Sequence, residues 1–185
     1  YPGNPTVLHL LGVIRVKLGR AAGAVENYDA ALKSGFDFVL LYNRGIAMRL
    51  LRRFDDARIS FEHAVKLNPG NAEAWNGLGN SMRDLGRADD AVLCFDRALA
   101  IRPSAPEMQY NRGTALFDLK RYEDAIASLD AALAQQPDMT EAWVNRGSAM
   151  RQLNRLDGAL ECFNRALALD PRNIKALNNR GALQH

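Results

Sequence analysis

Three histidines and two cysteines are among the side chains of this 185-residue chain whose types could support catalysis or bind a metal ion. They are His9, His63, His185, Cys94 and Cys162. The histidines are far apart in sequence, and no pair has the short spacing of a zinc site. No glycine-rich phosphate loop or nucleophile motif accompanies them. We therefore predict no catalytic residues, no metal and no cofactor, and we expect that the chain is not an enzyme.

A second pattern favours binding rather than catalysis. The tripeptide Asn-Arg-Gly occurs four times, at 43–45, 111–113, 145–147 and 179–181. An asparagine amide both donates and accepts hydrogen bonds, so a row of asparagines could hold the backbone of an extended peptide whatever its sequence. The alternative is that asparagine is simply a tolerated polar surface residue at this position.

The elements that position these asparagines follow a repeat. Glycines recur every 34 residues, and alanines, large apolar residues and prolines keep the same spacing. The recurring glycines are Gly45, Gly79, Gly113, Gly147 and Gly181. An earlier copy is visible at Gly12, Ala24, Tyr28 and Ala31, and its step to the next copy is 33 residues, one fewer than the others. Several interleaved series with one period indicate a stacked repeat architecture.

Each copy has the pattern of two helices. Between Ala72 and Ala105, apolar residues fall three and four apart in two stretches, which places them along one face of each of two helices. Gly86 separates the two stretches, and Pro103 cannot continue the second helix. We expect about eleven helices over residues 5–185. The tight turns should lie near 19–20, 52–53, 86–87, 120–121 and 154–155.

This unit resembles the tetratricopeptide repeat (TPR). The matching residues of the third unit are Trp75, Leu78, Gly79, Met82, Ala91, Phe95, Ala98 and Pro103. The resemblance implies an all-α TPR solenoid, a right-handed superhelix of stacked helix-turn-helix repeats. We predict a single TPR domain over 1–185, with repeats 5–37, 38–71, 72–105, 106–139, 140–173 and a partial repeat 174–185. The first repeat ends in Ser34-Gly35-Phe36-Asp37, and we expect Gly35 to cap its second helix in the left-handed conformation.

In this family the first helices of the repeats line a concave groove, which implies a set of ligand-facing positions. That set is Tyr42, Asn43, Arg49, Asn76, Asn80, Arg83, Tyr110, Asn111, Phe117, Asn145, Ser148, Arg151, Asn178 and Asn179. Our hypothesis is that Asn111 and Asn145 face solvent and hold an extended ligand. Gly77 interrupts the row in the third repeat. Arg49, Arg83 and Arg151 could bind an acidic side chain or a phosphate, or could be charges on a solvated face.

Four arginines occupy a position that is usually leucine in this family, namely Arg44, Arg112, Arg146 and Arg180. We expect their stems to pack and their heads to pair with carboxylates such as Asp96, Asp130 or Glu123, with peptide carboxylates as the alternative. The chaperone-binding members of the family hold a terminal carboxylate with basic residues. Here the corresponding basic residues are missing, so we do not expect that specialisation.

The remaining features have structural explanations. Cys94 and Cys162 are two periods apart, so we predict that both are small core residues and that no disulfide joins them. Glu73, Glu107 and Glu141 lie near the starts of first helices, where the helix dipole favours acids. The two cysteines give a weak indication of a cytoplasmic, reducing compartment.

Composition narrows the possible partners. A formal net charge of +3 is too small and too dispersed to indicate a nucleic-acid partner, and no apolar run is long enough for membrane insertion. The chain begins at Tyr1 and ends within a helix, so we expect a fragment of a longer protein. Ala176, Leu177 and Leu183 should be partly uncovered, which makes self-association through open solenoid ends possible.

We therefore predict a non-catalytic protein–protein interaction scaffold that binds an extended peptide or a partner helix in its concave groove. The alternative is the N-terminal substrate-recognition arm of a glycosyltransferase. The asparagine row and the residues Leu8 to Gly12 resemble the TPR arm of bacterial enzymes of the O-linked N-acetylglucosamine transferase and SPINDLY type.

Overall fold

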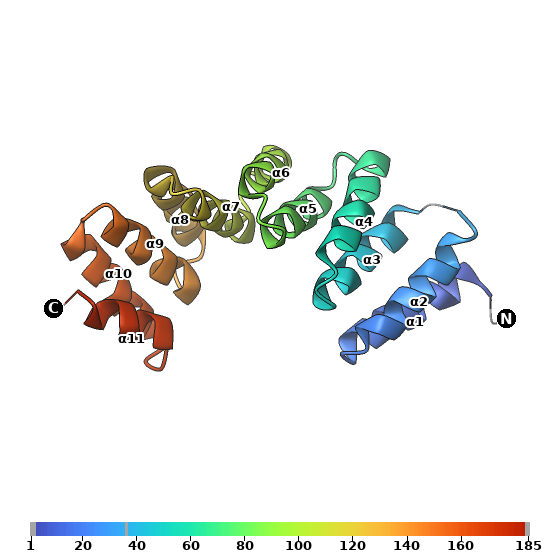
Figure 1. The fold of residues 1–185 in the computed structure, drawn as a ribbon, viewed down its shortest axis with the longest axis horizontal. Coiled ribbons are helices and arrows are strands. Elements are labelled where there is room, and N and C mark those ends of the chain that lie inside the picture. Colours follow the sequence, from blue (N-terminus) through green and yellow to red (C-terminus); the bar gives the residue numbers. More distant parts are fainter. Residues whose placement is uncertain (1–2, 36, 184–185) are drawn as a thin grey trace. The chain divides into compact units, whose positions relative to one another are not determined.

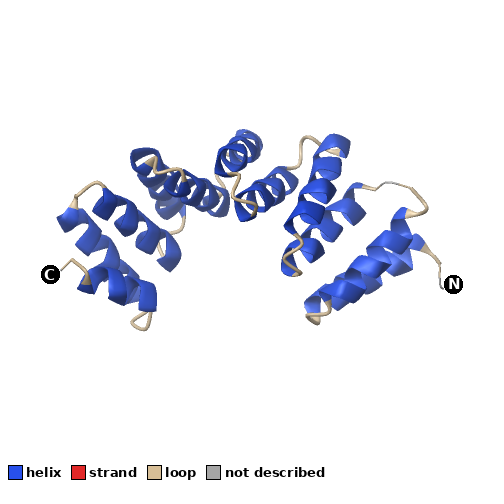
Figure 2. Ribbon diagram, in the orientation of Figure 1, coloured by secondary structure: helices blue, strands red, loops and turns tan. Residues whose placement is uncertain are grey.

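The computed structural model describes residues 3–35 and 37–183, and this part of the chain contains eleven α-helices and no strand. Helix and loop alternate along the whole described chain (Figure 2). The helices are α1 Pro5–Lys17, α2 Ala21–Leu32, α3 Phe38–Leu50, α4 Phe54–Leu67, α5 Ala72–Asp84, α6 Ala88–Ile101, α7 Pro106–Asp118, α8 Tyr122–Gln135, α9 Thr140–Gln152, α10 Leu156–Leu169 and α11 Ile174–Gly181. The all-α prediction, the number of helices and the five turn positions are confirmed.

The helices form two compact units, Tyr1–Ile101 with α1 to α6 and Arg102–His185 with α7 to α11 (Figure 1). In each unit the two helices of a repeat pack together. Within the units the second helices also pack on the first helix of the following repeat, α2 on α3, α4 on α5, α8 on α9 and α10 on α11. The first helices are neighbours as well, α1 with α3 and α3 with α5 in one unit, α7 with α9 and α9 with α11 in the other. That the two units form a single domain stays a prediction.

Short polar residues begin several of the first helices. Asp37 accepts hydrogen bonds from the backbone N–H groups of Val39 and Leu40, and so satisfies two donors that the start of α3 leaves without helical partners. Asn4, Asn71 and Asn173 cap α1, α5 and α11 in the same way. These caps fix the starts of α1, α3, α5 and α11, whereas α7 and α9 begin without a side-chain cap.

The turns between the two helices of a repeat depend on one residue with positive φ. Gly19 and Gly86 have φ of 72° and 75°, and Arg52, Lys120 and Asn154 adopt nearly the same conformation with φ of 56–61°. A side chain is disfavoured there, so glycine is the better residue at this position. Three of the five turns therefore place a side chain in this conformation, which Asn154 tolerates better than Arg52 or Lys120 does.

Gly35 departs from its predicted role. α2 ends at Leu32 with Lys33 as its C-cap, and Gly35 lies two residues beyond that cap with a φ of 141°. The residue directly after the cap is Ser34, whose N–H bonds to the carbonyl of Ala31. Gly35 therefore shapes the loop to the next repeat rather than the end of the helix. Phe36, which follows it, lies outside the described residues.

The core of the second, third and fifth repeats is a large ring held against a glycine. Phe61, Phe95 and Phe163 are at most 1% exposed, and each packs on the glycine of its own first helix. A Cβ atom built on Gly147 would lie 2.7 Å from the ring of Phe163, closer than carbon atoms normally approach. The glycine is needed because it lets the ring fill the space between the two helices.

The final helix differs from expectation at one residue. Ala176 is fully buried against Val144, Ala166 and Leu167, so the expectation that it is uncovered is wrong. This small side chain faces α9 and α10 instead of the open side. Leu177 is 41% exposed, as expected, and Ile174 is 71% exposed.

We predict that Gly147→Ala destabilises the protein and that Gly181→Ala does not. The two glycines hold the same repeat position, but a Cβ on Gly181 meets no heavy atom within 4 Å. Overpacking at Gly147 should lower the free energy of unfolding by about 1–3 kcal/mol. At Gly181 alanine should raise it by up to about 1 kcal/mol, because alanine favours the helix. Urea unfolding followed by circular dichroism measures both, and a stable Gly147→Ala protein would contradict the close-contact argument.

Candidate functional site

The polar residues predicted to face a ligand lie on the first helices of both units. We call this set the first-helix surface. In the unit Tyr1–Ile101 it consists of Tyr42, Asn43, Arg49, Asn76, Asn80 and Arg83, all half-buried. In the unit Arg102–His185 it consists of Tyr110, Phe117, Asn145, Ser148, Arg151 and Asn179, also half-buried, together with exposed Asn178 and buried Asn111.

The asparagines of this surface connect neighbouring repeats. Asn145 donates from Nδ2 to the hydroxyl of Tyr110 at 3.4 Å and to Oγ1 of Thr114 at 3.3 Å. Asn43 Nδ2 is hydrogen-bonded to His9 Nε2 at 2.9 Å, and His9 holds in its repeat the position that Tyr110 holds in its own. The row of amides therefore has a role in each unit that sequence reasoning missed, which is to bridge adjacent first helices.

Asn111 differs from the expectation, because it is buried and does not face solvent. Only 8% of this residue is exposed, so the hypothesis that its side chain faces solvent is wrong. Removing a buried, hydrogen-bonding amide generally costs free energy of folding. Asn145 is the better test residue, because it is half-buried and its two hydrogen bonds are long.

The arginines of the surface have different surroundings. Arg49 of α3 pairs with Asp84 of α5, with Nη2 2.8 Å from Oδ2, so its charge is balanced within the protein. Arg151 of α9 is half-buried and forms no ion pair among the described residues. Arg151 is therefore the stronger candidate for an acidic group on a ligand.

The arginines at the usual leucine position also join repeats. Arg146 reaches back to Asp130 of α8 at 2.5 Å and forward to Sγ of Cys162 at 3.0 Å, so its head pairs with the predicted carboxylate. Arg44 makes the same connection in the other unit, to Asp29 and to the hydroxyl of Ser60, both at 2.6 Å.

Two contacts differ from the expectation that these four arginines pair with carboxylates such as Glu123. Arg180 donates to the amide oxygen of Asn164 at 3.3 Å and not to a carboxylate, because asparagine replaces the acid at that position. Glu123 pairs with Arg155 at 3.6 Å and not with an arginine of this series. Arg112 donates to the hydroxyl of Ser128 at 2.7 Å.

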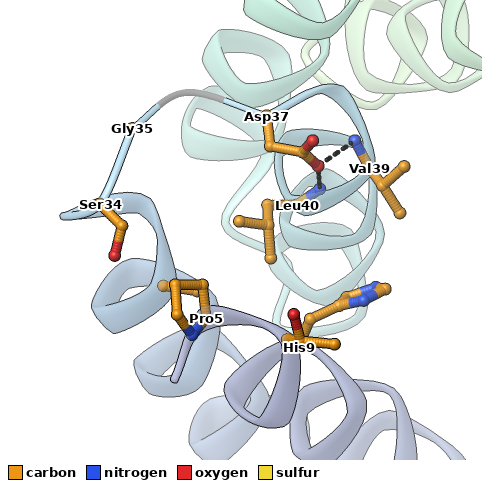
Figure 3. Close-up of a pocket in the computed structure, with 9 residues that line it drawn as sticks. Pro5, His9, Ser34, Gly35, Asp37, Val39 and Leu40 are labelled. Carbon is orange, nitrogen blue, oxygen red and sulfur yellow. Dashed lines mark hydrogen bonds between the residues drawn. The ribbon is translucent and has the colours of Figure 1, made fainter. Parts of the chain in front are cut away.

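A pocket opens where the first repeat meets the second (Figure 3). Its walls come from α1, from the end of α2 with its loop, and from the start of α3. The lining residues are Pro5, Thr6, His9, Ala31, Ser34, Gly35, Asp37, Val39 and Leu40. It combines an imidazole and a carboxylate with apolar walls. The one-residue shortening of the first repeat is the sequence signal that could have pointed to it.

Both cysteines are buried, as predicted for core residues. Burial, together with the nearby carboxylates of Asp90 and Glu62, raises the pKa of Cys94 to about 12. Burial also raises the pKa of Cys162, although its hydrogen bond from Arg146 acts in the opposite direction. Within the described residues, no three His, Cys, Asp or Glu side chains come together as a metal site would require. No described helix combines the length and apolarity needed to cross a bilayer.

Stacked pairs of antiparallel helices with a glycine-to-ring contact in each pair define a helical-repeat protein. The sequence profile described as "Tetratricopeptide repeat" matches residues 9–62, 42–106 and 110–174. The chain therefore belongs to the tetratricopeptide repeat family, and as such it is a protein-interaction scaffold.

Solved structures share this fold at low identity. YrrB, described as "a TPR protein with an unusual peptide-binding site", has a TM-score of 0.80 at 20% identity, covering 94% of this chain and 90% of its own. MamA has a TM-score of 0.82 at 22% identity over 95% and 96% of the two chains. The TPR protein TTC0263 of Thermus thermophilus gives 0.72 at 22% identity over 97% and 98%. No curated protein matches the chain significantly in sequence.

We predict that neither thiol reacts in the folded protein at pH 8. The raised pKa values keep both groups protonated there, and burial blocks the reagent. Titration with a chromogenic disulfide should detect no fast-reacting thiol in native protein and two thiols after denaturation. Zero thiols after denaturation without reductant would instead show a disulfide and contradict the prediction.

Proposed function

We propose that the first-helix surface binds an extended peptide through its backbone, with Asn145 as a central contact. The main support for this proposal is the pair of hydrogen bonds that fixes the orientation of the Asn145 amide. Both of its hydrogen bonds to α7 use Nδ2, so the amide is oriented and its Oδ1 is the acceptor that a ligand N–H would reach. A side chain fixed in this way loses little conformational freedom on binding.

Asn179 of α11 supports the same arrangement one repeat further on. It donates from Nδ2 to the hydroxyl of Ser148 on α9 at 3.4 Å. Two amides held by the same atom on neighbouring first helices could accept from successive N–H groups of one strand. Backbone contacts of this kind read no side chain, so we expect binding to be broad in sequence.

Charge would then select among peptides. Arg151 belongs to the same unit as Asn145 and has no ion-pair partner among the described residues, so it supports a preference for acidic ligands. In the other unit Asp84 balances the charge of Arg49, and Tyr42, Asn43, Asn80 and Arg83 would supply the polar contacts of the groove. The peptide-binding site in the description of YrrB makes a peptide ligand reasonable for this fold.

A glycosyltransferase arm is the second candidate function, favoured by the fourfold Asn-Arg-Gly and its resemblance to that enzyme class. Neither the matching family profile nor the structures named above carry a glycosyltransferase name. Under this proposal the same asparagines would hold the peptide substrate of the enzyme. Self-association through the open ends, and a cytoplasmic location based on the two cysteines, stay predictions.

We predict that Asn145→Ala weakens peptide binding without unfolding the protein. Loss of one hydrogen bond of net worth about 0.5–1.5 kcal/mol corresponds to about a 2- to 13-fold increase in Kd. Stability should stay within about 1 kcal/mol, because the bonds lost inside the protein are long and alanine favours the helix. A peptide array identifies a binder, and calorimetry then compares the affinities.

Gln135→Ala is the matched control. Gln135 is an exposed amide on second helix α8 of the same unit, and it bonds only to the backbone of its own helix among the described contacts. Its replacement should leave the affinity unchanged. Equal affinity of the Asn145→Ala protein, with an intact melting curve, would remove the proposed role of this amide.

A further inference from the structure

A groove lies over Leu41 of α3, with side chains of the second helices α2 and α4 along it. It consists of two adjoining hollows that share Leu41 and His63, with volumes of about 280 and 230 Å³. Lys66 and Leu67 of α4 line the first hollow, and the lining of the second includes Asp29 and Leu32 of α2 and Ile59 of α4. We call this feature the Leu41 groove. All of its residues belong to the unit Tyr1–Ile101.

Two later repeats carry tryptophan where the second repeat carries Leu41. The period of 34 residues places Leu41 at the position of Trp75 and Trp143. Trp143 packs against a core cluster that includes Leu133, and Leu133 is only 6% exposed. Leu32 is the counterpart of Leu133, but it is half-buried and lines the groove. The Leu41 groove is therefore a place where the repeat elsewhere holds an indole ring.

The contacts of Trp143 show what such a ring needs. Its indole N–H donates to the carbonyl of Pro137 at 2.8 Å, and the guanidinium of Arg146 lies over the ring, 5.8 Å from its centre. Arg44, the counterpart of Arg146, lines the Leu41 groove. Asp29 lines it as well, and its half-exposed carboxylate can accept a hydrogen bond from an N–H group. An indole bound there would therefore meet a cation and an acceptor, as Trp143 does.

One face of α4 extends the groove beyond the size of a single ring. Ile59, His63 and Leu67 are four residues apart and so lie on one side of the helix. Ile59 is 41% exposed and Leu67 is 51% exposed. At 1.5 Å per residue this face runs about 12 Å along α4, which is longer than an indole ring. A ring carried by a polypeptide, whose neighbouring residues contact Ile59 and Leu67, matches this length better than a free ring.

The two hollows differ in charge. In one of them Arg44 and Asp29 pair at 2.6 Å, so their charges balance. The other contains exposed Lys66, and among the described residues its lining includes no Asp or Glu. An acidic group beside the ring would therefore be attracted to Lys66.

We propose that the Leu41 groove binds a tryptophan side chain of a partner protein, next to an acidic residue that meets Lys66. The indole ring lies on Leu41 and Leu32, and its N–H donates to Asp29. Buried tryptophans often supply much of the binding energy of an interface. The groove uses no asparagine of the first-helix surface, so this proposal does not depend on the proposed peptide site.

The test uses the dipeptide N-acetyl-Trp-Glu amide as its probe and the intact 185-residue chain. Nuclear magnetic resonance of the His63 imidazole follows binding, because His63 lines both hollows. We expect saturable shifts with a Kd of about 1–10 mM, since one side chain supplies only part of an interface. N-acetyl-Ala-Glu amide should give no saturable shift. N-acetyl-Trp-Lys amide should bind about 3- to 10-fold more weakly than the Trp-Glu probe.

Two substitutions locate the site. Leu41→Trp fills the groove with the ring that Trp143 supplies in the fifth repeat, so it should raise the Kd at least about 10-fold. Leu177→Trp is the control, because Leu177 holds the same repeat position on α11, and the Kd should stay within about twofold. Lys66→Glu should reverse the preference, so that the Trp-Lys probe binds more tightly than the Trp-Glu probe. Lys66 is exposed, so this variant tests the groove even if Leu41→Trp does not fold.

Four results would overturn the proposal. The Trp-Glu probe could give no saturable shift at about 20 mM, or Leu41→Trp and Leu177→Trp could act equally in folded protein. Lys66→Glu could leave the preference between the two tryptophan probes unchanged. Finally, Leu41→Trp could convert a dimer of the chain into a monomer in sedimentation, which would show that the groove holds a second copy of this chain and not a different partner.

Discussion

The close approach of the two helices in each repeat is the constraint on which the rest of the structure depends. A glycine on the first helix leaves room for a large ring from the second, and the ring then fills the centre of the repeat. Because this contact fixes the distance between the two helices of a repeat, one face of each first helix remains available to a neighbouring repeat and another to solvent. Leu129 replaces the aromatic ring in the fourth repeat and packs on Gly113 in the same way, so the size of the filler varies while the glycine stays.

Polar contacts between repeats then determine what the surface can offer a ligand. Arg44 and Arg146 each hold an acid of the preceding repeat and a small polar group of their own. Such partly exposed ion pairs contribute little to stability by themselves, about 0–1 kcal/mol. Their effect is to orient the first helices, whose neighbouring asparagines, Asn43 and Asn145, also bond from one helix to the next. The proposed peptide site is therefore the exposed part of a network that joins the repeats.

Sequence predicted the fold well because the TPR pattern is local and repeated. Glycine spacing, apolar periodicity and the proline stops each depend on residues close in the chain, so eleven helices and five turns followed directly. The site was harder to predict. Whether Asn111 is buried or Arg49 is paired with Asp84 depends on side chains about one period away, which no periodicity reports. The same holds for His9, whose bond to Asn43 exists only once the two repeats are stacked.

The central claim is that a peptide is held by the first-helix amides and not elsewhere on the solenoid. Nuclear magnetic resonance of the side-chain amides tests this most directly, because each asparagine Nδ2 group gives its own pair of proton signals. Titration with an extended peptide should shift the signals of Asn145 and Asn179 while leaving the amides of Asn164 and Gln135, on second helices, in place. Shifts confined to the second-helix amides would contradict the account, because they would place the ligand on the other face of the repeats.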